Sequence, residues 1–551
     1  MIGDRAGNAY ILVSVRIRSN LAIHRTDIDY RPAATAFHRA LAAPERAQTA
    51  LLLATLRANA GTAYGRAHGF SRVQSLRQFQ DAVPVVGWDE VAPYVDRIAA
   101  GEANVLTAEP VRLLEPTGGS SGGTKWIPYT RTLQTQIRAA VAPWIADLFR
   151  SVPASAHGPA YWSVSPAVAQ ERTAGGLPVG FEDDGAYLSP LHRTLARATL
   201  AVPGALRHVA DPEAFRYATL RHLVARRDLA LVSVWNPTFL TLLLRPLRAW
   251  ADRLARDLDR GTLSADVPDA VAAGLRPDPA RAAEVRRLIA QTTTEADLVA
   301  ALWPRLALIS AWADGHAAGP ARSLQALVPQ ATFQPKGLIA TEGIVTIPLW
   351  GHGGGVPALT SHVLEFVPEG GGRPRFAHEV ETGARYGVLL TTGGGLTRYR
   401  LGDTVEVVGR VAASPLLRFV GRERAVSDRV GEKLHEGHVA QALAALDLDG
   451  FSMVAPDDTS SPIRYVLFSD ASSLPTAARR LDEALQTNVH YALARRLGQL
   501  GPVAAFRVRG DAEAGYLAGC AALGQRLGDV KPTALHRDGG WADRFEGDWV
   551  A

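Results

Sequence analysis

The segment from Thr117 to Lys125 gathers residue types that bind phosphate. It reads TGGSSGGTK, so four glycines separate two threonines, two serines and a lysine. Backbone N–H groups, hydroxyl groups and an ammonium are all donors that hold phosphate oxygens. The segment predicts a glycine-rich hairpin loop that wraps the β and γ phosphates of a nucleotide. The expected contacts are Thr117, Gly118, Gly119, Ser120, Ser121, Gly122, Thr124 and Lys125.

Two other motifs were weighed for the same segment. A Walker-type loop would place glycine before the lysine and Ser or Thr after it, whereas Thr124 and Trp126 stand there. A nucleophile elbow centred on Ser120 fits the letters GGSSG. Both motifs lead directly into a helix, and Pro128 opposes a helix at that place. A serine hydrolase that uses Ser120 remains an alternative of a different class.

Lysine is rare in this chain. Of 59 basic residues only Lys125, Lys336, Lys433 and Lys531 are lysines. If arginine replaces lysine wherever either serves, the four that remain are enriched for places that require a compact ammonium. The surroundings of each lysine therefore bear on function, although Lys336 and Lys433 receive no assigned role from the sequence.

Two further motifs carry carboxylates. ATEG, residues 340–343, ends an apolar strand and presents Glu342. LTRYRLGD, residues 396–403, places Asp403 just after a strand, where it can accept both hydroxyls of a ribose. Neither motif is specific alone. In this order and spacing, the loop and the two motifs resemble the adenylate-forming superfamily of acyl and aryl ligases.

The stretches YGVLLTTGGGLTRYRLGDTVEVVGR, ALTSHVLEFVPE, DLDRGTL and SVWNPTFL narrow the resemblance. They are similar to the auxin-responsive-promoter family of acyl acid amido synthetases, over about residues 32–551, in a bacterial-type form. The resemblance implies that a carboxylic acid and ATP give acyl-AMP and pyrophosphate. The amine of an amino acid then displaces AMP and forms an amide.

The resemblance also implies roles for single residues. Ala340 and Thr341 would line the adenine and the α phosphate, and Glu342 would bind Mg²⁺. Asp403 would bind the ribose, Arg422 would reach the nucleotide at the domain junction, and Lys531 would be carried onto the nucleotide by a mobile domain. ATP and Mg²⁺ are thus the expected cofactors, with Lys531, Glu342 and Lys125 as catalytic residues.

The chain departs from the family at Leu338, where an aromatic residue usually precedes the Thr-Glu pair. The acyl site is poorly marked. Trp235, Phe239, Trp312 and His316 are candidates by position alone, and buried packing is the simpler expectation for each.

Alternating apolar runs and amphipathic segments predict an α/β protein. We expect an extension at 1–31, a large adenylation domain with a β-rich part at 32–421, and a small mobile α+β domain at 422–551. Strand, loop, strand and helix should follow one another around the glycine loop, and one long helix should span 475–498.

Composition argues against several classes of protein. No apolar run is long enough to span a membrane, and the single Cys520 excludes an intrachain disulfide. Net charge is +5, but basic and acidic residues are mixed, which argues against nucleic-acid binding. We expect a cytoplasmic monomer that acts on a carboxylic acid and an amine, without membrane or nucleic-acid partners.

Rival functions stay open. A ligase of the same fold can transfer its acyl group to coenzyme A or to a carrier protein. A nucleotide-binding protein without catalysis is a further possibility.

Overall fold

A computed structural model describes most of the 551-residue chain. The described residues are 14–19, 22–27, 30–118, 124–163, 171–180, 199–422, 426–427, 429–430, 432, 434–523, 525, 530 and 532–550. The first two segments form the antiparallel hairpin of β1 (Ser14–Ser19) and β2 (Ala22–Asp27).

Helices follow the hairpin and pack on the main core, namely α1 (Arg31–Ala42), α2 (Pro44–Asn59), α3 (Ala63–Ala67), α4 (Leu76–Ala82) and α5 (Trp88–Ala99). Leu41, Leu52 and Leu56 are buried at helical spacing. The amphipathic pattern of this region therefore reflects packing.

A parallel sheet forms the first α/β layer. Its order is β10 (Thr332–Pro335), β9 (Leu308–Ala311), β8 (Leu231–Ser233) and β5 (Ala160–Trp162). Successive side chains of a strand point to opposite faces. On one face Leu231 and Leu308 pack against Leu148 of α6 (Arg131–Ser151), while Val232 and Ile309 face a separate helical core.

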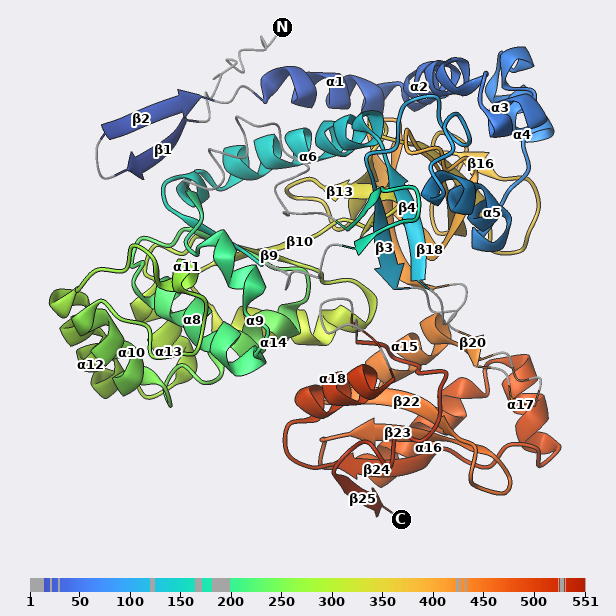
Figure 1. The fold of residues 1–551 in the computed structure, drawn as a ribbon. Helices are drawn as coiled ribbons and strands as arrows, with labels where there is room; N and C mark the ends of the chain where they lie inside the picture. Colours follow the sequence, from blue (N-terminus) through green and yellow to red (C-terminus); the bar gives the residue numbers. More distant parts are fainter. Residues whose placement is uncertain are drawn as a thin grey trace, which may run out of the picture.

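That helical core lies on the other side of the sheet from α6 (Figure 1). It contains α8 (Pro212–Val224), α9 (Pro237–Leu244), α10 (Ala251–Arg260), α11 (Asp269–Ala272), α12 (Pro279–Gln291), α13 (Glu295–Leu302) and α14 (Ala318–Leu327). The predicted layered α/β body is confirmed.

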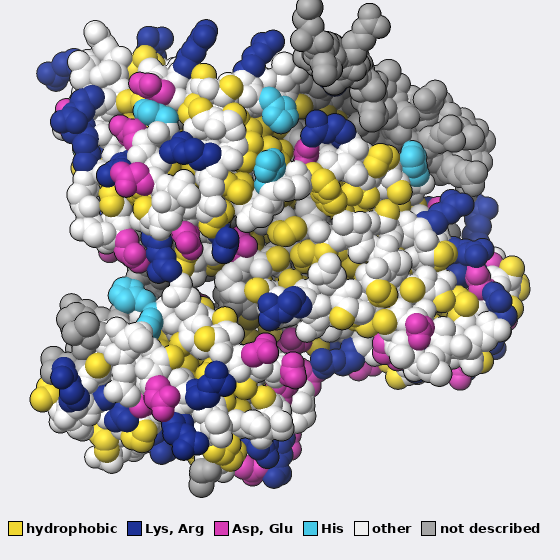
Figure 2. Space-filling view, turned by 180° about the vertical axis from the view of Figure 1, so that it is seen from behind, with side chains coloured by type: hydrophobic (Ala, Val, Ile, Leu, Met, Phe, Trp, Pro, Cys, Tyr) yellow, Lys and Arg dark blue, Asp and Glu magenta, His cyan; other side chains and the backbone are white. Residues whose placement is uncertain are grey.

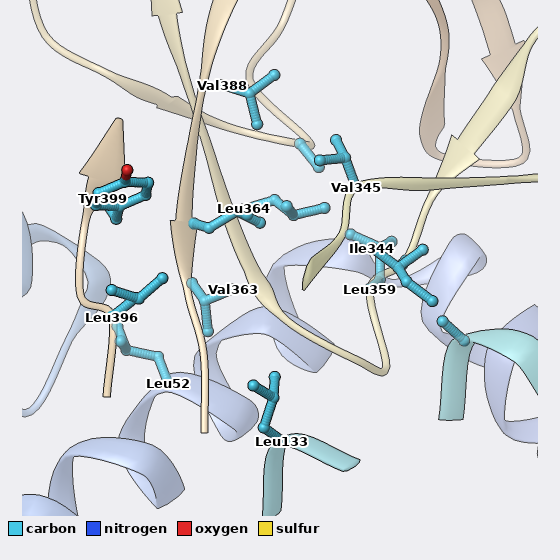
Figure 3. Packing of buried hydrophobic residues seen from close by; sticks show 14 of the residues in the cluster. Leu52, Leu133, Ile344, Val345, Leu359, Val363, Leu364, Val388, Leu396 and Tyr399 are labelled. Atoms are coloured by element: carbon cyan, nitrogen blue, oxygen red, sulfur yellow. The ribbon is translucent and has the colours of Figure 1, made fainter. Parts of the chain in front are cut away.

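The β-rich part is a seven-stranded sheet. Its order is β13 (Thr346–Pro348), β14 (Gly355–Pro357), β19 (Ser414–Arg422), β18 (Tyr399–Val411), β17 (Arg385–Thr391), β15 (Val363–Pro368) and β16 (Arg375–Phe376). Figure 3 shows its buried side chains, among them Leu364, Val388 and Tyr399, meeting Leu52 of α2 and Leu133 of α6. This packing joins the sheet to the helices that precede it.

The C-terminal region has a sheet of its own, ordered β22 (Ser452–Asp457), β23 (Arg464–Ser469), β24 (Ala504–Val508) and β25 (Gly547–Val550). Its other elements are β20 (Val426–Ser427), β21 (Leu434–His435), α15 (Glu436–Ala444), α16 (Leu474–Leu485), α17 (Val489–Arg496) and α18 (Ala512–Ala522). It lies beneath the large body in Figure 1, and the predicted small α+β C-terminal domain is confirmed.

The prediction of one long helix over 475–498 is wrong, because the structure has two separate helices there, α16 and α17. Asn488 Oδ1 accepts the N–H of Tyr491, so it caps a new helix, and Thr487 donates its hydroxyl proton to the carbonyl of Ala484. These side chains replace the missing helical hydrogen bonds between α16 and α17. The final strand β25 was not predicted.

In the described part of the chain, no helix combines the length and the apolar character that crossing a membrane requires. On the face shown in Figure 2, Lys and Arg side chains are interspersed with Asp and Glu among the described residues. This face thus has mixed charge, as the sequence predicted.

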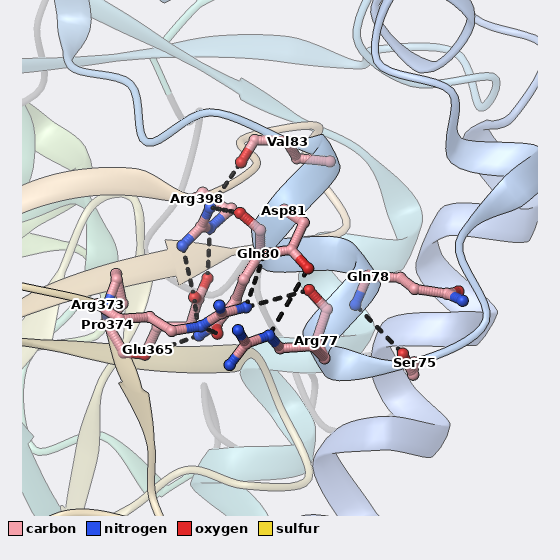
Figure 4. Close-up of polar contacts among 10 residues, drawn as sticks. All are labelled: Ser75, Arg77, Gln78, Gln80, Asp81, Val83, Glu365, Arg373, Pro374 and Arg398. Carbon is pink, nitrogen blue, oxygen red and sulfur yellow. Dashed lines mark hydrogen bonds and ion pairs between the residues drawn. The ribbon is translucent and has the colours of Figure 1, made fainter.

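A buried ion pair fixes the start of β18. The guanidinium of Arg398 donates to both carboxylate oxygens of Glu365, each at 2.9 Å, and to the carbonyl of Val83 at 2.6 Å (Figure 4). Arg398 has φ 48°, a left-handed backbone that is uncommon for a side chain of its size. The pair ties α4 and β15 to the strand that carries Asp403.

We predict that Arg398→Met lowers the free energy of unfolding by about 3–5 kcal/mol, because Glu365 becomes a buried charge without its partner. Urea titration measures the loss. Arg373→Met is the matched control, since Arg373 pairs with the exposed Asp81 and should change stability by less than about 1 kcal/mol. Equal losses in both variants would contradict the role of the buried pair.

Candidate active site

The glycine loop joins two strands, as its sequence predicted. β3 (Leu113–Gly118) pairs with β4 (Thr124–Tyr129), with Thr117 opposite Lys125. β4 begins at Thr124 and runs through Pro128, so a strand and not a helix follows the loop. The Walker-type loop and the nucleophile elbow both need a helix at this place, and neither motif fits the structure. The predicted contacts Gly119, Ser120, Ser121 and Gly122 lie outside the described residues, as does the side chain of Thr124.

Tyr129 connects this hairpin to the Thr-Glu motif. Its buried hydroxyl donates to the backbone carbonyl of Thr341 at 2.6 Å, although 212 positions separate the two residues. Lys125 and Tyr129 lie on the same face of β4 because they are four residues apart in a strand. The hairpin face that carries Thr117 and Lys125 is therefore the face that meets the Thr341 turn.

A second contact brings in the segment before LTRYRLGD. The Thr130 hydroxyl donates to the carbonyl of Gly393 at 2.9 Å. A side chain at Gly394 would place its Cβ 2.5 Å from the carbonyl oxygen of Pro128, so this approach requires glycine. The hairpin of the glycine loop thus touches the Thr341 turn and the segment that leads into LTRYRLGD.

Glu342 lies in a two-residue turn between β11 (Ile339–Ala340) and β12 (Gly343–Ile344). Its side chain is buried. Gly343 packs on the buried His362, whose Nε2 would be 2.8 Å from a Cβ at that position. Burial lowers the pKa of His362 to about 3, so a neutral imidazole supports the turn at physiological pH.

Asp403 lies within β18, not after a strand as the sequence suggested. Three residues, from Leu401 to Asp403, stand opposite the single residue Val388, which makes a β-bulge. Gly402 has φ 83° at this bulge and so explains the glycine of the motif. Asp403 is buried, and its backbone lies opposite that of Arg422 in the pairing of β18 with β19.

Several predicted contacts cannot be placed in this geometry. Lys531 and Lys433 lie outside the described residues, and so do the side chains of Arg422 and His316. The roles of Lys531, Arg422 and His316 stay predictions, and Lys433 still has no assigned role.

The remaining acyl-site candidates fall into two groups. Trp235 and Trp312 both follow strands of the parallel sheet, and the N–H of Trp312 donates to the carbonyl of Trp235 at 3.0 Å. Trp235 is 54% exposed, contrary to the simple expectation of buried packing. Phe239 instead packs against the helical core, with its ring 6.4 Å from that of Phe215.

A buried polar cluster lies beside these tryptophans and was missed by sequence reasoning. Lys336 Nζ donates to Ser233 Oγ at 2.8 Å and lies 4.8 Å from the ring centre of Trp235. Gln334 Oε1 accepts the indole N–H of Trp144 at 3.0 Å. The rarity of lysine singled out Lys336, but sequence cannot show that distant strands bury it.

Burial lowers the pKa of Lys336 to about 7, against 10.5 for an ordinary lysine. Between pH 7 and 10.5 the unfolded chain therefore binds more protons at this position than the folded chain. This difference makes the contribution of Lys336 to stability rise with pH across that window, and leaves it constant below pH 7.

We predict that the stability of Lys336→Met relative to the original chain decreases as pH rises from 7 to 9, by at most about 1.4 kcal/mol per pH unit. The Met variant lacks the titrating group, so the difference isolates Lys336. Urea unfolding of both chains at pH 6, 7, 8 and 9 gives the curve. A difference that does not vary with pH would show that the ammonium is not desolvated.

The described residues include no group of three or more His, Cys, Asp and Glu side chains suited to hold a metal ion. Mg²⁺ often binds through one or two carboxylates together with substrate phosphates and water. Glu342 lies on the turn that contacts the hairpin of β3 and β4, and it could be the one carboxylate of such a Mg²⁺ site.

Three domains of one family match nearly the whole chain. They are the GH3 family N-terminal domain at 33–332, the central domain at 355–422 and the C-terminal domain at 434–538. The matches follow the order of the structural regions described above.

Known proteins with similar sequences are amido synthetases. The chain is 24% identical to the probable indole-3-acetic acid-amido synthetase GH3.1 of Arabidopsis thaliana, over 78% of this chain and 74% of that protein. It is 25% identical to the jasmonoyl–L-amino acid synthetase JAR6 of Nicotiana attenuata, over 78% and 79% of the two chains.

The solved structure of the GH3.15 acyl acid amido synthetase has the same fold, with a TM-score of 0.82 at 21% identity, covering 96% of this chain and 98% of that one. The predicted α/β fold class is thereby confirmed. The predicted likeness to the acyl acid amido synthetases is also confirmed, and the chain belongs to the GH3 family.

Proposed function

We propose that this chain is an ATP- and Mg²⁺-dependent ligase that joins a carboxylic acid to the amine of an amino acid. The observation that carries the proposal is the hydrogen bond from Tyr129 to Thr341, which joins the hairpin of the glycine loop to the turn that carries Glu342. Membership of the GH3 family, whose relatives are named amido synthetases, supports the same reaction.

The first step forms a bond between a carboxylate oxygen of the acid and the α phosphorus of ATP, and pyrophosphate leaves. The four negative charges of ATP meet the negative charge of the carboxylate in this step. The protein must therefore supply positive charge and oriented hydrogen-bond donors. Lys125 and the hydroxyls of the glycine loop hold the β and γ phosphates. Ala340 and Thr341 line the adenine and α phosphate, and Asp403 accepts hydrogen bonds from the ribose.

Glu342 would hold Mg²⁺ together with the substrate phosphates, and the bound cation would supply further positive charge to the phosphate oxygens. Lys531 is brought to the nucleotide by the small domain, and Arg422 lies at the junction of the two domains. We propose the domain limits 1–31, 32–421 and 422–551 for this movement.

In the second step the neutral amine attacks the acyl carbon, AMP leaves, and the amine loses a proton to solvent. Such a ligase is expected to act as a monomer in the cytoplasm of a bacterium, without nucleic-acid or membrane partners.

Radioactive pyrophosphate exchange into ATP, across aryl, indolyl and aliphatic acids, tests the first step. Product analysis with the twenty amino acids and with coenzyme A then tests the acceptor. Amide with an amino acid supports the proposal, whereas product with a thiol alone identifies the rival ligase. Ester cleavage without ATP, lost in Ser120→Ala, would establish the hydrolase.

We predict that Glu342→Gln lowers kcat for pyrophosphate exchange by about 100-fold or more and raises the Mg²⁺ concentration needed for half-maximal rate, because the amide binds the cation poorly. Glu369→Gln, at an exposed position of the same region, is the control and should retain full exchange. Loss of rate with an unaltered Mg²⁺ requirement would assign Glu342 another role.

A further inference from the structure

One face of the parallel sheet is polar and aromatic at the ends of its strands. Ser233, Ser310 and Gln334 are in register on neighbouring strands, so their side chains share a face. Trp235, Trp312 and Lys336 follow these three residues by two positions each and continue the same rows. In open α/β sheets, ligands bind beyond the carboxyl ends of the strands, which is where these side chains lie.

This face holds more hydrogen-bond donors than acceptors. Lys336 brings three N–H donors, and among the described residues its one hydrogen-bond acceptor is Ser233 Oγ. Gln334 Nε2 is buried without a hydrogen-bond partner in the described structure, while its Oε1 accepts from both Trp144 and Ser310. Buried donors of this kind normally have partners, so the cluster has more donors than the acceptors that the described residues supply.

An anion would supply the missing acceptor and balance the charge of Lys336. Lys336 is 6% exposed, and among the described residues no carboxylate lies within ion-pair distance of it. Its near neighbours are the rings of Trp235 at 4.8 Å and Trp144 at 5.6 Å, which stabilise a cation only in part. Burial lowers the pKa of this lysine to about 7. Buried ionisable groups without structural partners are found at binding sites more than elsewhere.

Aromatic rings flank the cluster at the open edge of the sheet. Trp162 is 44% exposed and stands in register with Ser233, and Trp235 is 54% exposed two positions beyond it. Exposed indoles beside a buried cation suit a flat, anionic molecule. Lys336 also precedes Thr341 by five residues, a distance of at most about 17 Å along an extended chain.

We propose that Lys336 and Gln334 bind a second anionic group of the acid substrate, so that the chain activates an aromatic acid whose ring carries a carboxylate remote from the reacting one. This inference rests on the proposed function. The reacting carboxylate meets the α phosphate beside Thr341, and the remote carboxylate accepts hydrogen bonds from Lys336 Nζ and Gln334 Nε2. No bond is made or broken at this subsite.

Matched pairs of acids test the subsite by binding alone. Isothermal titration calorimetry compares terephthalate with 4-methylbenzoate, and isophthalate with 3-methylbenzoate, with and without ATP and Mg²⁺. Each pair has similar shape and differs by one carboxylate. We expect the dicarboxylate of at least one pair to bind 10-fold or more tightly than its methyl analogue.

Variants then test whether Lys336 and Gln334 cause the tighter binding of the dicarboxylate. Lys336→Met should bring the affinity ratio of that pair to within about threefold of unity. Gln334→Glu supplies a carboxylate from the chain itself and should remove the preference while raising the melting temperature. Arg286→Met, at an exposed position of α12, is the control and should keep the ratio.

Stability separates a binding role from a structural one. Lys336→Met should melt at or above the temperature of the original chain at pH 7, because it removes a buried unpaired charge. A large fall in melting temperature would overturn the proposal in favour of a structural lysine.

Other outcomes also overturn it. These are equal binding within both pairs, no binding of any of the four acids, or a Met variant that weakens both acids of a pair equally. The last result would mean that Lys336 holds the reacting carboxylate. Calorimetry does not depend on turnover, so a preference without pyrophosphate exchange would refute the proposed function and leave the subsite standing.

Discussion

The hydrogen bond between Tyr129 and the carbonyl of Thr341 is the contact on which the candidate site depends. A glycine-rich loop has no fixed shape of its own, because glycine gives up much backbone freedom on ordering. The strands beside the loop must therefore be held by their neighbours. Tyr129 holds β4 to the Thr-Glu turn, and Thr130 holds the same strand to the segment before β18. The buried pair of Arg398 and Glu365 then fixes where β18 begins.

Local patterns in the sequence were sufficient to select the candidate residues of this site. The donors of the loop, Glu342 and Asp403 could be selected by residue type, and Pro128 predicted a strand where two familiar motifs need a helix. The family and the α/β class were also predicted correctly. Each of these features depends on residues close together in the chain.

Features that depend on distant residues could not be predicted in the same way. The bulge at Gly402 exists only against Val388 of the neighbouring strand. The exposure of Trp235 and the burial of Lys336 depend on how four parallel strands and α6 meet. The break between α16 and α17 does have a local cause in Asn488, but the apolar pattern continues across it.

Several buried groups near the site lack the partners that a stable core would give them. Lys336 has no carboxylate partner in the described structure, Gln334 Nε2 has no acceptor there, and neither ring nitrogen of His362 has a hydrogen-bond partner among the described residues. Departures of this kind cost stability and are expected where a protein binds or transforms a substrate.

The central claim is that an acid is activated by bonding to the α phosphate of ATP. An acid labelled with ¹⁸O in its carboxylate, incubated with the enzyme, ATP, Mg²⁺ and the accepting amino acid, tests this claim by mass spectrometry of the products. The account predicts one ¹⁸O atom in AMP for each amide formed. Label in inorganic phosphate, or amide formed without label in AMP, would contradict it.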